Sequence, residues 1–511
     1  MVTAAAAVPD ARAQIRLAPA LAAHRAERVD VVGVAGIEGA EVARLLLAAG
    51  FTHVVGHDQA ARDAFPAAFD RAHAGLRPAE RAARRAALLA GLAGVRLGAE
   101  YLGDIGRTTL VIPGQAWFLH PANAPLQALA AAGTPFYSLT QAYLDGAAGT
   151  VIGVSGSHGK TTTTWLLAAL ARAAGRFTRV HLAGNDRHNA QCLLEVATGG
   201  PGDCLILEIS NRQLLQATTA PAVACLTNVT PNHLGEHGGL SGYLRAKHRL
   251  FTLPGNRVAV RNGDDPLSLR HCPPAAGATE WRFAANAREL GGHDGAFEAA
   301  GTIRVRIGGR EQPVVETGAL RLLGAHNRAN VRAALATLAA ATGTVAPQAA
   351  AALQAFPPLR HRLQLVWQQD GVDWIDDLNS TTPQSTVAAV RALGRPCRLI
   401  AGGDDKGLDF AELAGLVPDP VREVILLPGA GSERLRAALA AAGAGGHGRP
   451  VADLAAAVAA AAGAAQPGEA VLLSPGCPGV FGAFYGPGGF RAAVRRLVGG
   501  ATSPPPRRGS G

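Results

Sequence analysis

Short apolar runs rich in Val, Ile and Leu recur along the chain, and each is followed by a turn and then by helical periodicity. Residues 29–34 form the first run, residues 40–47 repeat apolar side chains with a helical period, and residues 51–58 form a second run ending in a carboxylate. A strand, a helix and a second strand in this order predict a βαβ unit of Rossmann type. The chain therefore begins as an α/β fold with a parallel sheet.

The same alternation restarts twice, and 511 residues are too many for one core at about 100–200 residues per domain. Further strands are expected at residues 110–112, 151–154, 204–210, 222–228, 372–377, 397–401, 424–427 and 470–473. Turn signals around residues 347–358 indicate a hinge. The predicted organisation is a loose leader (1–28), a Rossmann-like domain (29–147), a central parallel-sheet domain (148–352), a second Rossmann-like domain (353–499) and a disordered tail (500–511).

Residues 149–164 are the most informative stretch, because an apolar strand leads into a glycine loop, a lysine and four threonines. A helix that starts there presents backbone N–H groups and a positive dipole end to an anion. Lys160 adds a charge for the outer phosphates, and the hydroxyl of Thr161 suits Mg²⁺. Val154 stands where the usual phosphate-loop pattern has its first glycine. The stretch predicts a nucleoside triphosphate site in a P-loop ATPase-like domain, and a chance glycine turn is the alternative.

Two buried strands of the central domain end in polar residues. Glu208 lies near the end of the run 204–210, and the run 222–228 opens into His233. The carboxyl ends of neighbouring parallel strands are where ligands of open α/β sheets collect. A buried carboxylate is costly unless it is paired or metal-bound, so Glu208 is a candidate metal ligand.

Composition narrows the class of protein. Hydrophobic residues make up 48% and charged residues 17%, as in a globular chain. The six cysteines form no C-x-x-C pair, which favours a reducing cytoplasm without disulfides or zinc. No apolar run approaches the ~18 residues that span a membrane. A net charge of +10 fits nucleic acid or anionic small substrates; without an aromatic–basic cluster, we expect the small substrates and no nucleic-acid partner.

Seven motifs in one order resemble the Mur ligases of peptidoglycan synthesis, and most closely the MurD type, the UDP-N-acetylmuramoyl-L-alanine:glutamate ligases. They are the phosphate loop and residues 207–214, 228–234, 243–247, 324–330, 361–362 and 402–406. The resemblance runs from about residue 29 to residue 498. It implies a three-domain enzyme of cell wall biogenesis, with links to cell shape, cell division and the cell cycle, whose first domain binds UDP.

The resemblance implies an ATP-dependent ligase. ATP phosphorylates the terminal carboxylate of the substrate, and the amine of glutamate then attacks the acyl phosphate. Lys160 would hold the outer phosphates, while Thr161 and Glu208 would hold one Mg²⁺. His233 and Lys247 would hold a second Mg²⁺, with Lys247 carbamylated on its amine, because a carbamate is an oxygen ligand suited to magnesium.

The remaining site residues are also carried over from the resemblance. The catalytic set is Lys160, His233, Lys247, Arg362 and Lys406. ATP would meet Gly156, Ser157, His158, Gly159, Lys160, Thr161, Thr162, Asn327, Arg362 and Asp404. The other substrates would meet Gly36, Glu38, Asp58, Asn185, Asn379, Thr381, Thr382 and Ser474. In the first domain, Gly33, Gly36 and Gly39 give no strict G-x-G-x-x-G pattern, so a purely structural turn stays open there.

The departures from the family pattern lie in the pocket for the incoming amino acid. Asn379 stands where the family commonly has a lysine that binds the carboxylate of D-glutamate. The following Thr381 and Thr382 resemble a subgroup that adds L-glutamate. D-Glutamate is the default of the family and L-glutamate is the alternative; Arg212 or the two threonine hydroxyls are candidates to hold the carboxylates.

Two other functions compete with this one. A folylpolyglutamate or cyanophycin synthetase would keep the fold and change the substrate, although the UDP-type first domain argues against a folate ligase. A nucleotide-binding scaffold without catalysis would not need the metal ligands. We expect a cytoplasmic enzyme that acts on small molecules, does not contact membranes and is a monomer.

Overall fold

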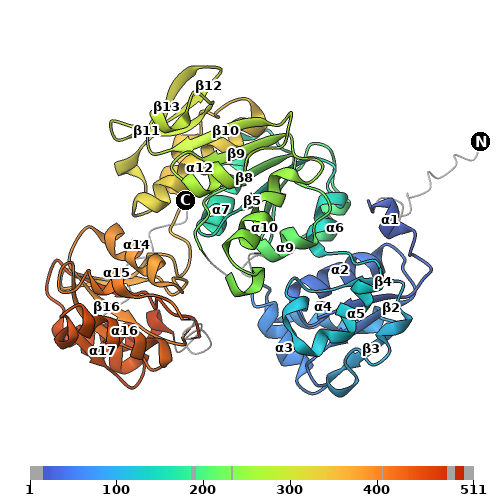
Figure 1. Cartoon of the computed structure of the whole chain (residues 1–511), viewed down its shortest axis with the longest axis horizontal. Coiled ribbons are helices and arrows are strands. Elements are labelled where there is room, and N and C mark those ends of the chain that lie inside the picture. Colours follow the sequence, from blue (N-terminus) through green and yellow to red (C-terminus); the bar gives the residue numbers. More distant parts are fainter. Residues whose placement is uncertain (1–14, 186–190, 232–233, 406, 480–488, 500–511) are drawn as a thin grey trace, which may run out of the picture. The chain divides into compact units, whose positions relative to one another are not determined.

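A computed structural model of the chain describes residues 15–185, 191–231, 234–405, 407–479 and 489–499. The chain divides into two compact units. The first comprises Met1–Ala319 and Ala329–Ala355, and the second comprises Leu320–Arg328 and Phe356–Gly511. The first unit holds two sheets and the second holds one (Figure 1).

The first sheet of the first unit is fully parallel, in the order β3-β2-β1-β4. Its strands are β1 (Val29–Val32), β2 (Val54–Asp58), β3 (Gly94–Leu97) and β4 (Leu110–Ile112). Its helices are α1 (Pro19–Ala22), α2 (Ile37–Ala48), α3 (Phe65–Ala72), α4 (Pro78–Gly91), α5 (Ala124–Ala131) and α6 (Leu139–Gly146). The 3₁₀ turns are η2 (Gly98–Glu100), η3 (Ile105–Arg107), η4 (Trp117–Leu119) and η5 (Pro121–Asn123). Strands β1 and β2 are buried along their whole length, as expected for a parallel sheet covered on both faces.

The second sheet has nine strands in the order β13-β12-β11-β10-β9-β8-β5-β7-β6. The strands are β5 (Thr150–Ser155), β6 (Val180–Gly184), β7 (Cys204–Glu208), β8 (Val223–Leu226), β9 (Val258–Asn262), β10 (Thr279–Ala284), β11 (Gly295–Ala299), β12 (Thr302–Ile307) and β13 (Arg310–Glu316). Its helices are α7 (Lys160–Ala174), α8 (Leu193–Ala197), α9 (Asn211–Gln216), α10 (Leu240–Thr252), α11 (Pro266–His271), α12 (Ala325–Thr342) and α13 (Ala349–Ala355), with 3₁₀ turns η6 (Leu234–His237), η7 (Arg288–Leu290) and η8 (Thr317–Ala319). Strand β5 lies between β7 and β8, so the loop that follows it opens at the centre of the sheet.

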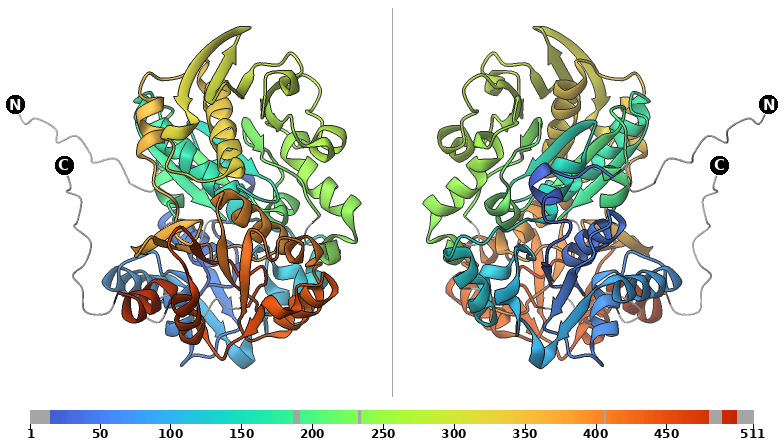
Figure 2. Two further views of the ribbon diagram at one scale, coloured as in Figure 1. Left: turned by 90° about the vertical axis from the view of Figure 1, so that its left-hand side faces the viewer. Right: turned by 90° about the vertical axis from the view of Figure 1, so that its right-hand side faces the viewer.

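Strands β11, β12 and β13 extend one edge of this sheet as an antiparallel meander (Figure 2). The sequence analysis did not anticipate this extension. Strand β12 alternates apolar and polar residues, and Gly308 and Gly309 connect it to β13 with positive φ angles of 57° and 75°. A two-residue glycine loop between alternating segments is a strong hairpin signal, so the signal was present in the sequence.

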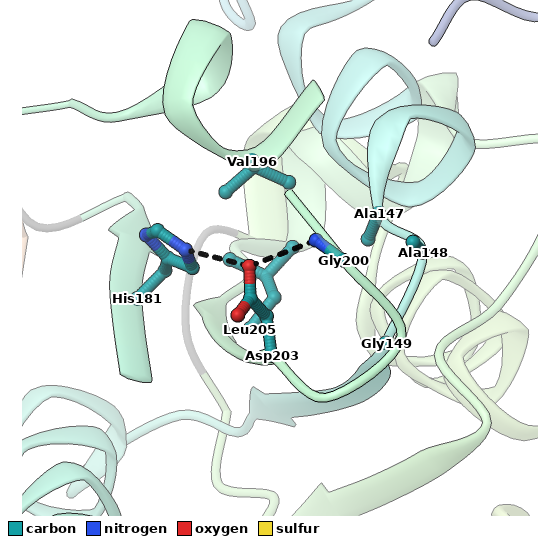
Figure 3. Close-up of a pocket in the computed structure, with 8 residues that line it drawn as sticks. All are labelled: Ala147, Ala148, Gly149, His181, Val196, Gly200, Asp203 and Leu205. Atoms are coloured by element: carbon teal, nitrogen blue, oxygen red, sulfur yellow. Dashed lines mark hydrogen bonds and ion pairs between the residues drawn. The ribbon is translucent and has the colours of Figure 1, made fainter. Parts of the chain in front are cut away.

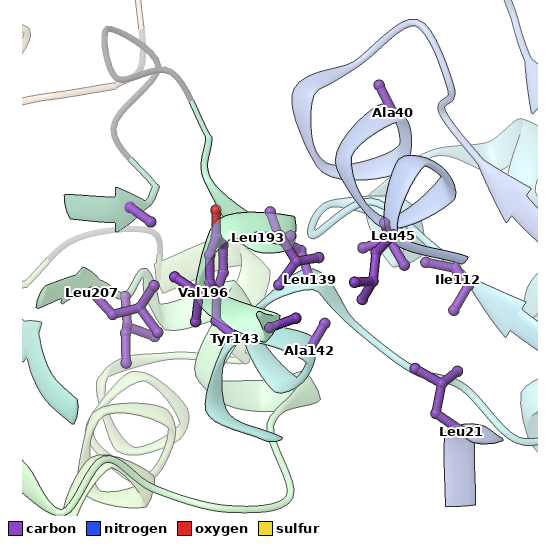
Figure 4. Packing of buried hydrophobic residues seen from close by; sticks show 14 of the residues in the cluster. Leu21, Ala40, Leu45, Ile112, Leu139, Ala142, Tyr143, Leu193, Val196 and Leu207 are labelled. Carbon is purple, nitrogen blue, oxygen red and sulfur yellow. The ribbon is translucent and has the colours of Figure 1, made fainter. Parts of the chain in front are cut away.

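One continuous apolar core joins the two sheets of the first unit. It includes Leu45 of α2 and Ile112 of β4 beside the first sheet, and Leu193 of α8 and Leu207 of β7 beside the second. Figure 4 shows Tyr143 of α6 beside Val196 and Leu193, on the side of the second sheet. Its ring is fully buried, and its hydroxyl lies 2.9 Å from the side-chain oxygen of Gln191. Burial of this shared apolar surface ties the first sheet to the second.

The second unit contains a six-stranded sheet in the order β14-β15-β19-β16-β17-β18, parallel except for the β14–β15 pair. Its strands are β14 (Gln364–Gln369), β15 (Val372–Asp376), β16 (Cys397–Ala401), β17 (Val421–Leu426), β18 (Gly448–Pro450) and β19 (Ala470–Leu473). Its helices are α14 (Pro383–Leu393), α15 (Ala411–Ala414), α16 (Ala430–Ala441), α17 (Leu454–Ala464) and α19 (Phe490–Leu497), with the 3₁₀ turn η9 (Gly445–His447). Thr382 caps α14 by a reciprocal pair of hydrogen bonds with Ser385. The predicted mixed α/β fold with parallel-rich sheets is confirmed.

Among the helices of the described residues, none has both the length and the apolar character needed to cross a lipid bilayer.

Candidate active site

The loop between β5 and α7 has the shape of a phosphate cradle. Gly156 and Gly159 have φ angles of 147° and 81°, a region that residues with a Cβ rarely adopt. A Cβ on Gly156 would lie 1.9 Å from the hydroxyl oxygen of Thr227, and one on Gly159 would lie 2.3 Å from Oδ1 of Asn330. The backbone approaches its neighbours too closely for any side chain at these two positions. Val154, which replaces the usual first glycine, is still within β5, so the loop simply starts later.

Lys160 is the first residue of α7, and its ammonium folds back over the loop. Its Nζ atom donates to the carbonyl oxygens of Gly156 at 2.8 Å and Ser157 at 3.1 Å. The helix gives its first N–H groups no intrahelical acceptor, and its dipole adds partial positive charge. Thr161 and Thr162 belong to this first turn. The geometry therefore places a cation and a helix N-terminus around the loop, as phosphate binding requires.

Hydrogen bonds to residues outside the loop fix Ser157 and His158. The hydroxyl of Ser157 lies 2.8 Å from the Tyr243 hydroxyl and donates to the carbonyl of Thr230 at 3.0 Å. The backbone N–H of His158 donates to the side-chain oxygen of Asn228 at 3.0 Å. These contacts fix the loop in one conformation, so Ser157 serves at least as a support for the cradle.

Lys247 of α10 points into the floor of this loop. Its side chain is 1% exposed, and its Nζ atom donates to the hydroxyl of Ser155 at 3.2 Å and the carbonyl of Gly156 at 2.9 Å. Burial, followed by repulsion from Lys160, holds the pKa of Lys247 well below its usual value. A lysine on a solvated helix face would not be buried in this way.

Glu208 ends β7, directly beside Val154 of β5. It is buried, its Oε1 atom accepts a hydrogen bond from the Asn185 side chain at 3.0 Å, and its Oε2 atom has no hydrogen-bond partner among the described residues. An orphaned carboxylate oxygen next to a phosphate loop suits a hard cation such as Mg²⁺. The donor set present around the loop therefore fits the expected Mg²⁺ and nucleotide.

The predicted nucleotide-sugar residues cluster at the carboxyl end of the first sheet. Gly36 caps α2, and Asp58 accepts a hydrogen bond from the backbone N–H of Ala35 at 2.8 Å. Glu38 accepts from the backbone N–H of Gln115 at 2.6 Å and from the side chain of Gln213 at 2.9 Å. Asp58 thus orders the glycine turn, while Glu38 connects it to the second sheet. Direct contact of these side chains with a ligand stays a prediction.

Three predicted nucleotide-binding residues belong to the second unit. Asn327, in the first turn of α12, donates to the carbonyl of Leu323 at 2.8 Å. Arg362 is near His326, and burial together with Arg362 lowers the pKa of His326 to about 4. Asp404 follows β16 and is exposed, and its backbone N–H donates to the carbonyl of Pro478 at 2.9 Å.

The loop predicted to meet glutamate lies after β15 in the same unit. The backbone N–H of Asn379 donates to the carbonyl of His361 at 3.2 Å. Ser474, at the end of β19, is buried, and its hydroxyl donates to Asp377 at 2.9 Å. Burial raises the pKa of Asp377 to about 6, against the lowering effect of its hydrogen bonds.

Two of the proposed carboxylate holders already have strong partners. The hydroxyl of Thr382 takes part in the cap of α14. Arg212 forms a bidentate ion pair with Glu236, at 2.8 Å and 2.6 Å. Thr381 is half-buried in the same loop. Arg212 would have to leave a charge-assisted pair to bind a substrate carboxylate.

His233 and Lys406, both predicted to be catalytic, lie outside the described residues. A small pocket is found away from this chemistry, lined by Gly149, His181 and Asp203 at the amino ends of strands β5 to β7 (Figure 3). Asp203 accepts there from the backbone N–H of Gly200 at 3.1 Å. Because the phosphate loop follows the carboxyl end of β5, this pocket lies at the opposite end of the sheet.

Sequence reasoning missed two residues of the site, Asn330 and Tyr243. Asn330, on the second turn of α12, lies against Gly159 and 3.4 Å from the hydroxyl of Thr163. Tyr243 supports the loop through Ser157, and Lys247 lies 5.4 Å from the centre of its ring. Both residues stand inside motifs that the sequence showed, but their contacts depend on the folded chain.

The strand, loop and helix together define a phosphate-loop nucleotide-binding protein, and comparison with known proteins specifies the family. The Mur ligase middle domain matches residues 154–338, and the Mur ligase glutamate ligase domain matches residues 361–477. The UDP-N-acetylmuramoylalanine–D-glutamate ligase of Symbiobacterium thermophilum is 39% identical over 330 residues, which cover 64% of this chain and 70% of the relative. The enzyme of the same name from a Roseiflexus species is 34% identical over 414 residues, covering 77% and 85%.

Solved structures agree on the fold. The UDP-N-acetylmuramate–alanine ligase MurC of Thermotoga maritima aligns with a TM-score of 0.56 at 16% identity, over 92% of this chain and 98% of that one. MurF of Acinetobacter baumannii aligns with a TM-score of 0.51 at 19% identity, over 70% and 77%. The chain belongs to the Mur ligase family. It is accordingly an ATP-dependent ligase.

Proposed function

We propose that this enzyme joins glutamate to UDP-N-acetylmuramoyl-L-alanine in the cytoplasm, as a step of peptidoglycan synthesis. The observation that carries the proposal is the phosphate loop with Lys247 and Glu208 buried beside it, in a chain of the Mur ligase family. A binding scaffold has no need to bury a lysine and an orphaned carboxylate next to a nucleotide loop, because each is costly without a catalytic or metal-binding role. The domain limits 29–147, 148–352 and 353–499 and the monomeric state are part of this proposal.

The proposed reaction has two covalent steps. A carboxylate oxygen of the alanine residue attacks the γ-phosphorus of ATP, the bond to the bridging oxygen breaks, and ADP leaves. The amine nitrogen of glutamate then attacks the acyl carbon, the carbon–oxygen bond to phosphate breaks, and the nitrogen loses a proton to give the amide. Both steps depend on positioning and on neutralising oxyanion charge.

The roles of the residues follow from their places around the loop. Lys160 and the first turn of α7 would bind the outer phosphates, with Thr161 and Glu208 on one Mg²⁺ and His233 and a carbamylated Lys247 on a second. When bound, Mg²⁺ neutralises phosphate charge and orients the transferring group. In the structure, Lys160 donates to loop carbonyls and Lys247 is shielded from solvent, which supports these assignments.

The second unit would supply the remaining contacts. Arg362, Asp404 and Lys406 would act on the nucleotide phosphates, and Asn327 would contact the adenine. Asn379, Thr381, Thr382 and Ser474 would surround the incoming amino acid. Gly36, Glu38, Asp58 and Asn185 would surround the nucleotide sugar.

D-Glutamate is the acceptor favoured by the relatives, since each one cited carries D-glutamate in its name. L-Glutamate is the second candidate, because Asn379 replaces the lysine expected on the D-glutamate carboxylate. The test is phosphate release with UDP-N-acetylmuramoyl-L-alanine and ATP, compared with and without each glutamate enantiomer. Phosphate release that needs the nucleotide sugar and one enantiomer supports the proposal; ATP hydrolysis indifferent to both contradicts it.

A further inference from the structure

Gln115 lies three residues after β4, an edge strand of the first sheet. All four of its polar groups form hydrogen bonds with other residues. Its backbone N–H donates to Glu38 at 2.6 Å, and its carbonyl accepts from the side chain of Gln216 at 2.9 Å. Its side-chain oxygen accepts from the hydroxyl of Ser210 at 2.7 Å, and its side-chain nitrogen donates to Oδ1 of Asn185 at 3.2 Å. A glutamine that follows β4 thus contacts three residues beside the second sheet: Ser210 and Gln216 at the two ends of α9, and Asn185 after β6.

The hydrogen bonds through this side chain run in one direction. Ser210 caps α9, and its hydroxyl oxygen accepts from the backbone N–H of Gln213 at 3.1 Å. The hydroxyl proton of Ser210 is therefore available for Gln115. Because Oε1 of Gln115 accepts that proton, its Nε2 atom must be the end that faces Asn185. Chains of donors aligned in this way strengthen one another in a low-dielectric interior.

This series of hydrogen bonds ends at Glu208, the candidate metal ligand. Asn185 donates from Nδ2 to Oε1 of Glu208 at 3.0 Å, and its backbone N–H donates to the Glu208 carbonyl at 3.0 Å. An ionised carboxylate only accepts, so the Asn185 amide must present its nitrogen and keep its oxygen on the far side. The Nε2 atom of Gln115 donates a hydrogen bond to that oxygen. With Oε1 held by Asn185, the buried Oε2 atom, which has no partner within the described parts of the chain, is the oxygen left for a cation.

We propose that Gln115 is a positioning residue that orients the Asn185 amide and, through it, aims the Glu208 carboxylate at the cation beside the phosphate loop. Gln115 also donates its backbone N–H to Glu38 of the nucleotide-sugar turn, so it links that turn to the Glu208 carboxylate by way of Asn185. The inference rests on the proposed function only in taking Glu208 as a Mg²⁺ ligand. Gln115 itself touches no reacting atom in this account.

The test measures the affinity for Mn²⁺ on the full chain, from the electron paramagnetic resonance signal of the free ion, without substrates or turnover. Gln115→Met keeps the length of the side chain and removes both of its hydrogen bonds. We expect it to weaken Mn²⁺ binding about three- to tenfold, because the Asn185 amide is then free to turn. Gln216→Met is the matched control. It removes the hydrogen bond to the Gln115 carbonyl but leaves intact the relay, that is, the hydrogen bonds that run from Ser210 through the side chains of Gln115 and Asn185 to Glu208. It should change the affinity for Mn²⁺ less than twofold.

Two further variants decide the interpretation. In an Asn185→Ala background, Gln115→Met should have little additional effect, because the relay is already broken. Glu208→Gln tests the metal site itself. If Glu208→Gln weakens Mn²⁺ binding while Gln115→Met matches the wild type, the inference is wrong and the proposed function stands. If Glu208→Gln changes nothing, the metal site of the proposed function fails, and the inference fails with it.

The remaining outcomes also decide. Gln115→Met and Gln216→Met could weaken Mn²⁺ binding equally, or Gln115→Met could keep its full effect in the Asn185→Ala background. Either result would show that Gln115 only anchors its own loop, and would overturn the proposed orientation of Asn185. Thermal unfolding checks that each variant is folded. Gln115→Asn, which keeps the amide but shortens its reach, replaces Gln115→Met if that variant does not fold, with the same expected loss of affinity.

Discussion

The Nζ atom of Lys247 lies 2.9 Å from the carbonyl oxygen of Gly156, the residue that opens the phosphate loop. The lysine reaches this carbonyl from α10 and is buried together with Ser155, whose hydroxyl is its second acceptor. Helix α10 thus places the Nζ atom of Lys247, a nitrogen nucleophile, beneath the phosphate loop. This relationship is the structural basis for the expected modification of Lys247.

We expect Lys247 to carry a carbamate in the active enzyme. The amine attacks the carbon of CO₂, forms an N–C bond and loses a proton, which turns a cation into an anionic oxygen ligand suited to Mg²⁺. The chain contains only three lysines, Lys160, Lys247 and Lys406. Incubation with ¹³C-bicarbonate should give one carbamate resonance in the wild type and none in Lys247→Ala.

The same variant should lose ligation and partly recover it with short carboxylic acids, which place oxygen atoms where the carbamate stood. Lys160→Ala is the control for the spectrum, because it should keep the resonance. A wild-type enzyme that is active without any carbamate signal would show that Lys247 acts as an amine.

Lys160→Ala should lower the rate of ATP-dependent ligation by about 10²-fold or more, the effect of removing one preorganised charge contact. The folded state should persist, because the ammonium is half-buried at the surface of the loop and supports no apolar core. Steady-state kinetics and circular dichroism on the same sample separate the two effects. Near-normal turnover in the folded variant would remove Lys160 from the phosphate site.

Asp377 makes the stability of the second unit depend on pH. Its pKa is about 6 in the folded protein because of burial, against about 3.8 when unfolded, so the folded state binds the proton more tightly. The free energy of unfolding should therefore fall as the pH rises from about 4 to about 6, by up to about 3 kcal/mol from this group. Asp377→Asn should lack this contribution, because an amide does not ionise.

The measurement compares denaturant unfolding of the wild type and Asp377→Asn at pH 4 and pH 7. The variant should gain stability relative to the wild type at the higher pH. Asparagine can keep the hydrogen bond from the backbone N–H of Leu363, but its NH2 group cannot accept the one from Ser474. Loss of that bond affects both pH values alike, so the change of the difference with pH reports the charge. A difference independent of pH would mean that Asp377 ionises as readily in the folded state as in the unfolded one.

The glutamate pocket that we propose in the second unit would select the enantiomer of the incoming amino acid. Replacing the family lysine by Asn379 removes a charge-assisted contact of about 1.5–3 kcal/mol. If no other cation takes its place, the enzyme should accept L-glutamate at a rate at least comparable to D-glutamate. Values of kcat/KM for the two enantiomers give the answer. A large preference for D-glutamate would show that the carboxylate contact is made from elsewhere in the pocket.

The central strands and the phosphate loop could be predicted because their signals are local. Buried runs such as Cys204–Glu208 and the glycine loop before Lys160 carry their structure in a few neighbouring residues. The β12–β13 hairpin also had a local signal, in its alternating residues and the glycine pair, and was overlooked. The part that could not be predicted depends on long-range pairing.

Gln115 illustrates that second class. Its partners Asn185 and Ser210 are far away in the sequence, and no periodicity or spacing around Gln115 predicts these contacts. The orphaned oxygen of Glu208 is visible only once the direction of the Asn185 amide is known. The sequence could thus suggest candidate ligands of a site, whereas the direction of their polar atoms required the fold.

The transfer of oxygen from substrate to phosphate tests the central claim most directly. UDP-N-acetylmuramoyl-L-alanine labelled with ¹⁸O at both oxygens of its alanine carboxylate is incubated with ATP, Mg²⁺ and glutamate, and the released phosphate is analysed by mass spectrometry. An acyl phosphate intermediate leaves one substrate oxygen on phosphorus, so each released phosphate should contain one ¹⁸O atom. Phosphate without ¹⁸O, released as fast as the amide forms, would contradict activation of the carboxylate by ATP.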